Sequence, residues 1–236
     1  ITSHLYEEAK KRENIEIMTH CTMLDIIEED GECRGVVYQD AQGNPDVIEA
    51  PDTVLATGGL GGLFHNSTNF RHLTADSLAV CLRHQIELKN INYIQIHPTT
   101  FYSKKPGRRF LISESVRGEG AYLLDKNGER FTDELKPRDV VTAEIRKQMA
   151  KDHTDHVYLS VTHLDGERIK KRFPNIYRQC LEEGYDMAKD WIPVTPAQHY
   201  FMGGIKVNLD SKTSMEHLYA AGETSCNGVH GKNRLA

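Results

Sequence analysis

The segment DTVLATGGLGGLF, residues 52–64, decides the fold class. It opens with an apolar, β-branched run, which is typical of a buried central strand. The run stops at Thr57-Gly58-Gly59, and glycines at the carboxyl end of a strand allow another molecule to approach the backbone. A plain tight turn is the alternative, because glycine marks turns far more often than ligand sites.

The segments around this strand predict a mixed α/β domain. Residues 1–14 have the spacing of a surface helix, and a second helix is predicted over 73–88. Short strands are predicted at 15–18, 23–29, 33–40, 47–50 and 91–102. The turn residues at 41–46 predict that the two strands flanking them form a hairpin.

The pattern of the sequence changes near residue 90 and changes back near residue 200. Short elements alternate there with turns, and the patterns predict helices at 137–152 and 173–184 and a strand at 156–161. Strand-like segments after residue 201 resemble the pattern of residues 1–90 again. We therefore predict one α/β domain formed by residues 1–90 and 201–236, interrupted by an inserted α+β domain at residues 91–200.

Composition excludes several classes of partner. The formal net charge of −5 gives no reason to expect a nucleic acid. Five cysteines without a CxxC pair predict no metal site and fit a reducing, cytoplasmic setting. No apolar run approaches the roughly 20 residues that span a bilayer, so no membrane is expected. One short basic cluster is interpreted as a solvated loop: Lys104, Lys105, Arg108 and Arg109.

Several polar or cationic residues lie beside a glycine, a proline or a turn. They are His97, Ser113, Glu114, Arg138, His199, His230 and Arg234. Arginine and histidine at loop ends suit small carboxylates, because arginine offers a planar fork of donors and histidine one donor more. Taken singly, His97 is more simply a structural histidine, and Arg138 an ion pair with Asp139 at the start of a helix.

Six segments together resemble one protein family. They are LATGG, IHPT, RRFLISESVRGEGAYL, ELKPRDVV, PAQHYFMGG and GETSCNGVHGKNRLA. In this order and with similar spacing they are found in the flavoproteins related to succinate dehydrogenase and fumarate reductase. The resemblance covers essentially all 236 residues, and it is greatest for the branch of the family that oxidises L-aspartate.

The resemblance implies a fold and a cofactor. Residues 1–90 and 201–236 would be pieces of a Rossmann-like FAD-binding domain, and residues 91–200 would be its capping domain. The chain would be the middle of a longer enzyme, without the glycine-rich dinucleotide fingerprint and a C-terminal helical domain. Since that fingerprint supplies donors to the pyrophosphate, we expect the chain by itself to bind FAD weakly or not at all.

The resemblance also assigns roles to residues of the site. Arg138 matches an arginine that exchanges a proton with the substrate carbon, which requires a neighbouring relay and a dry site. His97, His199 and Arg234 match residues that hold the substrate carboxylates. Ser113 and Glu114 match a Thr-Glu pair of other members. We expect these six residues to converge on one cleft between the inserted domain and its flanks.

On the cofactor side, Glu223 matches an acid that contacts FAD. The other residues expected to line the cofactor are Thr22, Met23, Ala56, Thr57, Gly58, Gly59 and Asp76. Asp76 stands in Ala75-Asp76-Ser77, where the family has Gly-Asp-Gly. Because both glycines are missing, we expect the local backbone to differ there.

The implied activity is the FAD-dependent oxidation of L-aspartate to iminoaspartate, with O2 or fumarate as acceptor. This is the first step toward quinolinate and NAD, so quinolinate synthase would be a partner in the pathway. Two alternatives stay open. The chain could belong to a fumarate reductase or succinate dehydrogenase flavoprotein subunit, or it could be an inactive piece that binds no FAD.

Overall fold

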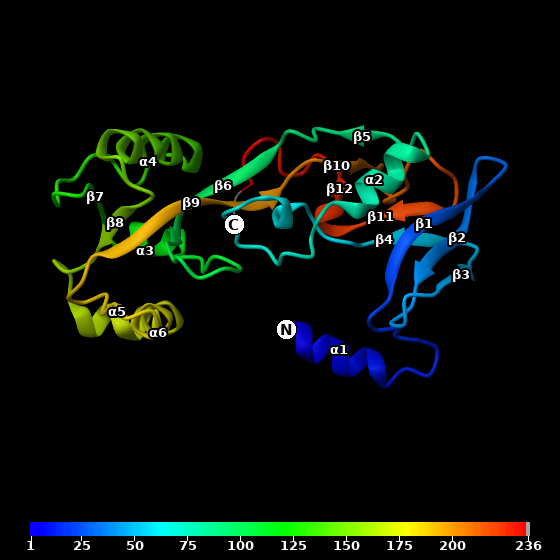
Figure 1. Ribbon diagram of the computed structural model, residues 1–236, viewed down its shortest axis with the longest axis horizontal. Coiled ribbons are helices and arrows are strands. Elements are labelled where there is room, and N and C mark those ends of the chain that lie inside the picture. The colour runs from blue at the N-terminus through cyan, green and yellow to red at the C-terminus, as the bar shows by residue number, and fades with distance from the viewer. Residues whose placement is uncertain (235–236) are drawn as a thin grey trace.

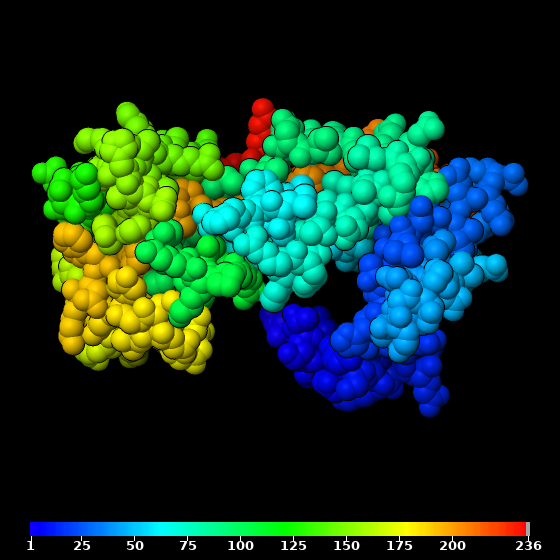
Figure 2. Space-filling model, in the orientation of Figure 1, coloured from blue at the N-terminus to red at the C-terminus, as the bar shows by residue number. Residues whose placement is uncertain are grey.

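The computed structural model describes residues 1–234, which form two groups of elements joined by a pair of long strands (Figure 1). The joining strands are β6 (Ile94–Phe101) and β9 (Ile192–Phe201), which pair antiparallel. Each strand runs from one group into the other, so both groups are attached to the same ribbon of backbone. A space-filling view shows two lobes, with the N-terminal helix standing apart from them (Figure 2).

The first group contains the strand that ends at the glycine turn. This strand, β4 (Thr53–Leu55), pairs in parallel with β11 (Leu218–Ala220). Beside them lies an antiparallel meander of β1 (Thr22–Glu29), β2 (Glu32–Gln39) and β3 (Pro45–Glu49). In a further sheet, β10 (Gly204–Lys206) lies between β5 (Leu88–Lys89) and β12 (Ser225–Cys226). Helical elements complete the group: α1 (Thr2–Lys10), η1 (Gly61–Leu63), α2 (Asp76–Arg83) and η2 (Gly222–Thr224).

The second group is built on a four-stranded antiparallel sheet. Its strand order is β6-β9-β8-β7, with β7 at Tyr122–Leu124 and β8 at Val157–Ser160. Helices surround this sheet: α3 (Glu114–Gly118), α4 (Arg138–Asp152), α5 (Gly166–Arg172) and α6 (Pro174–Glu182). Pro174 begins α6 because proline fits the first turn of a helix, where its missing N–H is not needed.

Each group has its own hydrophobic core. The first core contains Leu55 and Cys81 together with Ile205 and Leu218, so segments from both ends of the chain are buried against each other. In the second core, every buried member lies between residues 101 and 194. Burying one leucine or isoleucine side chain contributes roughly 1.5–3 kcal/mol. Each core is therefore a substantial source of stability for its own group.

Most predicted elements are confirmed, and three are corrected. Residues 15–18 do not form a strand, because no neighbouring strand within residues 1–234 satisfies their backbone groups. The helix predicted at 73–88 covers only Asp76–Arg83, since Ala75 before it has a left-handed conformation. The strand at the glycine turn is not buried on both faces: Leu55 is 2% exposed, but Val54 is 60% exposed.

Helices α2 to α6 bury apolar residues in the two cores, whereas α1 buries none. The longest helix, α4, buries Val141 and Ile145 while its other side faces solvent. Of the helices within residues 1–234, none combines the length and the apolar character needed to cross a membrane.

A histidine between two carboxylates connects α2 to β1. His84 follows the last residue of α2, and its Nε2 lies 2.8 Å from Asp25 Oδ1 while its Nδ1 contacts Glu28 Oε2. Arg83 also pairs with Asp25 at 3.2 Å. Burial works against a charged imidazole, but the hydrogen bonds with Glu28 and Asp25 outweigh it and raise the pKa of His84.

We predict that this contact makes stability depend on pH. A raised pKa in the folded state means that the stabilisation is complete below the unfolded value of 6.5 and is lost as pH rises through the folded value. Its size should be on the order of 1 kcal/mol, since solvent screens the partly exposed carboxylates. Urea unfolding at several pH values should show this loss for the wild type and not for His84→Gln. His4→Gln, on the exposed face of α1, is the control and should keep the wild-type profile.

Candidate active site

Two irregularities in the β6–β9 pairing position the candidate residues. Pairing passes from Gln95–Tyr200 directly to Ile96–Gln198, so His199 is the extra residue of a bulge. A second shift lies between His97 and Thr100, around a proline that cannot donate a hydrogen bond to the ladder. Bulges re-aim side chains, and here the result is that the rings of His97 and His199 lie 5.3 Å apart, edge to face.

Hydrogen bonds hold both imidazoles in place. The backbone N–H of Thr99 donates to Nδ1 of His97 at 3.2 Å, so the neutral ring carries its proton on Nε2. Nδ1 of His199 lies 2.8 Å from the hydroxyl of Thr68. His97 is only 1% exposed. Nε2 of His97 is therefore a fixed donor for a ligand in this part of the molecule.

The surroundings keep both histidines uncharged. Burial lowers the pKa of His97 to about 2, and His199, Arg117 and Arg138 add to the effect. Burial also lowers the pKa of His199 to about 4, with contributions from Arg138 and Arg234. At neutral pH both rings can thus donate or accept hydrogen bonds without adding charge to a site that already contains several cations.

Arg138 is the first residue of α4, and it contacts a carboxylate from another helix. Its Nε donates to Oε2 of Glu114 at 2.6 Å, and its Nη1 donates to Oε1 of Gln95 at 3.1 Å. The arginine is 8% exposed, whereas the Glu114 side chain is 50% exposed. The ion pair with Asp139 that the sequence allowed does not form. A buried guanidinium instead meets a carboxylate that reaches solvent, which is the arrangement that a proton relay needs.

The last described residues close the same region. Nε2 of Gln95 donates to Oδ1 of Asn233 at 2.9 Å and to the carbonyl of Arg234 at 2.6 Å. The Arg234 guanidinium lies over the Tyr200 ring, 4.4 Å from its centroid. This contact places Arg234 beside the bulge that carries His199.

Ser113 lies next to this region, and its hydroxyl contacts Ser115 of α3. It caps α3, its hydroxyl accepting from the N–H of Ser115 at 3.2 Å. Its neighbour Ile112 is hydrogen-bonded to Thr99 of β6. The structure thus gathers His97, Glu114, Arg138, His199 and Arg234 around one end of the β6–β9 ribbon, with Ser113 adjacent. Their roles with a substrate remain predictions.

Three residues of this region were missed at the sequence level. Gln95 precedes His97 by two positions, and the alternation of a strand places them on the same face. Arg117 follows Glu114 by one helical turn and is 2% exposed. Within residues 1–234, only its Nη1 has a partner, the carbonyl of Glu134 at 2.5 Å, while Nε and Nη2 have none. No sequence pattern indicated Thr68, because its contact with His199 forms only when the chain folds.

The glycine turn after β4 lies against η2 and forms the expected cofactor side. The hydroxyl of Thr57 donates to that of Thr224 at 3.3 Å. A Cβ at Gly59 would lie 2.4 Å from Oε1 of Glu223, so any other residue there would require the Glu223 side chain to move. Burial raises the pKa of Glu223, whose Oε1 accepts from the N–H of Phe201 at 2.9 Å. Gly58 has φ +76°, which lets the backbone turn at this point.

The remaining cofactor candidates are less tightly connected. Ala75 adopts φ 65° and ψ 29°, the conformation that glycine takes without strain, at a cost of roughly 1–2 kcal/mol. Asp76 is exposed and accepts from the hydroxyl of Thr74 at 3.0 Å. Met23 packs against the first core, and Thr22 is exposed at the start of β1. Ala56 is exposed beside Thr57. Within residues 1–234, no hydrogen bond joins Thr22 or Asp76 to the glycine turn.

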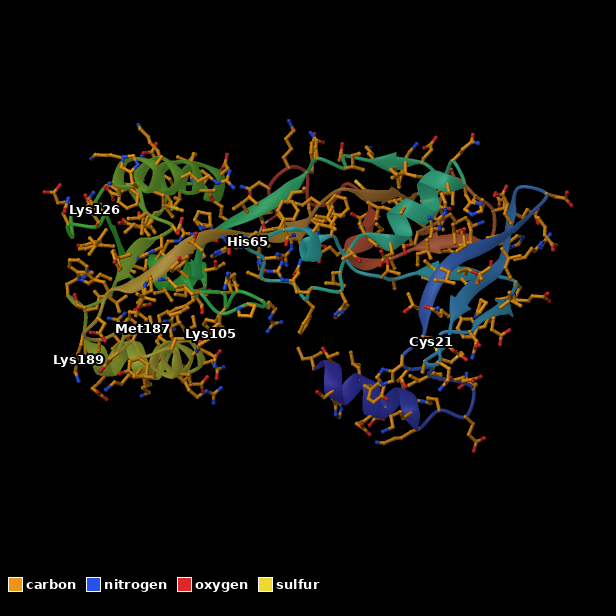
Figure 3. All side chains as sticks on the ribbon, in the orientation of Figure 1. Cys21, His65, Lys105, Lys126, Met187 and Lys189 are labelled. Carbon is orange, nitrogen blue, oxygen red and sulfur yellow. The ribbon has the colours of Figure 1, made fainter. Side chains whose placement is uncertain are left out.

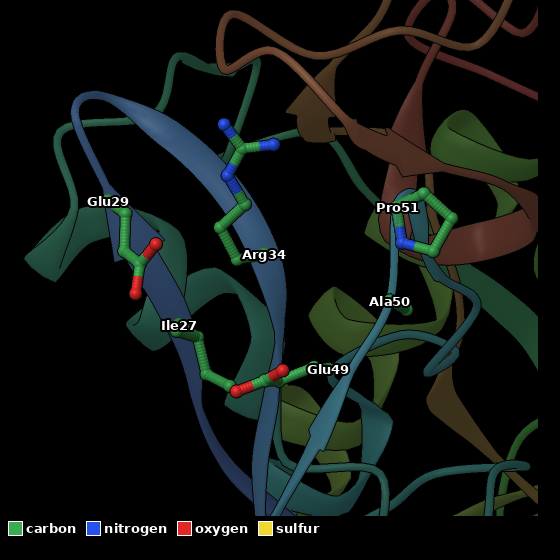
Figure 4. Close-up of a pocket in the computed structure, with 6 residues that line it drawn as sticks. All are labelled: Ile27, Glu29, Arg34, Glu49, Ala50 and Pro51. Atoms are coloured by element: carbon green, nitrogen blue, oxygen red, sulfur yellow. The ribbon is translucent and has the colours of Figure 1, made fainter.

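A separate hollow lies among the strands of the meander. It has a volume of about 350 Å³, and its lining includes Glu29, Arg34 and Glu49 (Figure 4). No predicted site residue lines it. The charged groups there belong to the outer strands of the first group, away from the cluster on β6 and β9.

Comparison with known proteins identifies the class as flavoprotein. The sequence matches the FAD binding domain family over residues 1–236, and the chain belongs to that family. FAD is therefore its cofactor. The structure fits this cofactor at the glycine turn, where Ala56 and Thr57 are exposed and the half-buried carboxylate of Glu223 stands beside Gly59.

Among the relatives, the chain is 56% identical over 233 residues to the L-aspartate oxidase of Clostridium perfringens, which covers 98% of this chain and 53% of the relative. It is 54% identical over 235 residues to that of Clostridium acetobutylicum, covering 98% and 54%. The chain thus spans about half the length of these curated relatives. Its fold is that of the flavoprotein in E. coli quinol fumarate reductase, with a TM-score of 0.87, 32% identity, and coverage of 99% of this chain and 44% of that one.

We predict that His97 and His199 do not titrate where an ordinary histidine does. With pKa values of about 2 and about 4, both should stay neutral down to about pH 5, because burial and the neighbouring arginines oppose the imidazolium. The imidazole NMR signals of His97 and His199, followed against pH, would measure this. A midpoint near 6.5 for either ring would contradict the prediction.

We also predict that Gly59→Ala is destabilising by roughly 1–3 kcal/mol, because its methyl group would overlap the Glu223 carboxylate that the backbone of Phe201 holds in place. The measurement is urea unfolding. Gly118→Ala is the matched control, since a Cβ there meets nothing within 4 Å and alanine favours the helix. Equal stability for the two variants would show that Glu223 moves freely.

Proposed function

We propose that this chain is part of an L-aspartate oxidase, which converts L-aspartate to iminoaspartate with O2 or fumarate as electron acceptor. The observation that carries the proposal is the pairing of buried Arg138 with Glu114 next to two neutral histidines. The identity of 56% to an L-aspartate oxidase supports the choice of substrate. The product would pass to quinolinate synthase, and the five free cysteines support a cytoplasmic setting.

In this proposal residues 91–200 form a capping domain over an FAD-binding domain made of residues 1–90 and 201–236. The two separate cores support the division, since the second core draws only on residues 101–194. The two joining strands β6 and β9 would then be the hinge. Closure of a cap over the substrate excludes water from the reaction.

FAD, when bound, supplies the acceptor for the hydride. Thr57, Gly58 and Gly59 would hold it through their backbone, because Thr57 is exposed and the two glycines have no side chain that would obstruct a close approach. Glu223 would add a hydrogen bond from the buried side. Arg138 and the two histidines would face the substrate on the other side.

The chain's own residues would bind the dicarboxylate at its two ends. His97 Nε2 and His199 would donate to one carboxylate, and the Arg234 guanidinium would neutralise the other. Arg138 would hold a proton beside the carbon between them. When fumarate is reduced, one alkene carbon needs a hydride and the other a proton. Arg138 would deliver that proton and regain it through Glu114, which reaches solvent.

The second candidate function is fumarate reduction or succinate oxidation without activity toward aspartate. The TM-score of 0.87 to quinol fumarate reductase favours it. An assay of the purified full-length enzyme with each substrate decides between the two. Formation of hydrogen peroxide and an imino acid from L-aspartate supports the first candidate, and turnover of succinate alone supports the second.

For fumarate reduction by the full-length enzyme we predict different kinetic effects for two arginines. Arg138→Ala should lower kcat by roughly 10²–10⁴-fold with little change in KM, because the proton transfer is made only in the transition state. Arg234→Leu should chiefly raise KM, since it removes an interaction that substrate and transition state share. Arg178→Ala, an exposed arginine of α6, is the control.

Steady-state kinetics would measure both effects. Near-normal turnover of the Arg138 variant would refute its role as proton donor. An unchanged KM in the Arg234 variant would remove that residue from the substrate site, whatever the identity of the substrate.

A further inference from the structure

We propose that a second cavity, of about 530 Å³, binds a small phosphorylated anion. It lies between the segment that follows η1, at residues 65–71, and the loop that follows β6, at residues 102–109. These segments adjoin in the middle of the molecule (Figure 2), and one labelled residue of each, His65 and Lys105, is shown in Figure 3. The volume is in the range of sites that hold small molecules.

Positive charge dominates the lining of this cavity. Arg71, Lys104, Lys105 and Arg109 line it, and Asp155 is the one carboxylate among its lining residues. Lys105 also reaches Glu183 at 3.0 Å. In a chain with a net charge of −5, such a concentration of cations favours an anion with two or more negative charges.

Arg109 gives the cavity a fixed donor group. The sequence predicted a solvated loop, and that interpretation is wrong for this residue, which is 8% exposed. Its Nε donates to Oδ1 of Asn66 and its Nη1 to the carbonyl of Lys105, both at 2.9 Å. Neither contact is with a carboxylate, and no acceptor within residues 1–234 takes up Nη2. A planar, oriented guanidinium with an unpaired charge matches the geometry of a phosphate.

One short segment connects this cavity to His199. Asn66 holds Arg109 through its side chain, and its carbonyl accepts from the N–H of Gln198 at 2.9 Å. The carbonyl of Ser67 accepts from the N–H of Arg109 at 2.7 Å. Thr68 then contacts Nδ1 of His199 at 2.8 Å. An anion bound to Arg109 would therefore act on the orientation of His199, although the cavity shares no residue with the candidate active site.

Calorimetric titration of the chain with pyrophosphate tests the binding. The double variant Lys104→Gln/Lys105→Gln removes two exposed cations from the cavity without touching a core. It should raise the Kd for pyrophosphate about tenfold or more, because each lost charge-assisted contact is a large part of the affinity. The matched control is Lys147→Gln/Lys171→Gln, which removes two exposed lysines elsewhere and should stay within about twofold of the wild type.

Three results would overturn the proposal. One is the absence of pyrophosphate binding by the wild type at millimolar concentration, and another is an equal loss of affinity in both double variants. The third is a cavity-dependent affinity for succinate but not for pyrophosphate, which would reject the phosphate class. Because the test needs neither FAD nor turnover, it is independent of the proposed activity.

NMR of the His199 imidazole tests the connection. Pyrophosphate should shift this signal in the wild type and leave it unchanged in Lys104→Gln/Lys105→Gln. Thr68→Val should keep the affinity for pyrophosphate and lose the shift, because it removes the contact with Nδ1 of His199 and a longer hydrogen bond to the carbonyl of Gln198, and Thr68 does not line the cavity. A shift of full size in the Thr68 variant, or none in the wild type at saturation, would overturn the connection between the two sites.

Discussion

The antiparallel pairing of β6 with β9 is the constraint on which the rest of the structure depends. Strand β6 runs from the first hydrophobic core to the second, and β9 runs from the second back to the first. The two strands therefore fix both groups of elements to one ribbon. The two irregularities in their pairing occur where the histidines lie. A regular ladder would alternate its side chains strictly between the two faces, and the extra residue at His199 breaks that alternation. The candidate site is thus a consequence of imperfect pairing.

Electrostatics explains the protonation states around this ribbon. Arg138 acts on both histidines, Arg117 on His97 and Arg234 on His199, and burial removes the water that would screen them. Among the described residues 1–234, only Glu114 forms an ion pair with one of these arginines. Buried charge without a partner is costly, so a dianionic ligand would stabilise the cluster by supplying what it lacks. Neutral histidines then add donors without increasing the repulsion among the arginines.

On the cofactor side, the space around the backbone constrains the residues more than charge does. Parallel pairing of β4 with β11 brings the glycine turn next to η2, although the two are far apart in the chain. The carboxylate of Glu223 then occupies the space that any side chain at position 59 would need. Gly59 leaves space for the Glu223 carboxylate, and that carboxylate in turn disfavours a larger residue at position 59. The left-handed Ala75 shows that the chain accepts local strain nearby rather than change the course of its backbone.

Local patterns in the sequence determined much of this protein. The periodicity of apolar residues located α4 and most strands. The order and spacing of short motifs, which can be read from one sequence, carried the resemblance to a flavoprotein family and so selected His97, Arg138 and Glu223. Periodicity failed at residues 15–18, where an apolar pattern has no strand to pair with. What only the tertiary structure decided is the set of contacts between distant segments: the partner of Arg138, the contact of Thr68 with His199, and the burial of Arg109 in a loop that is basic throughout. The physical reason is that burial and hydrogen bonding depend on neighbours brought together by folding, and no local pattern records them.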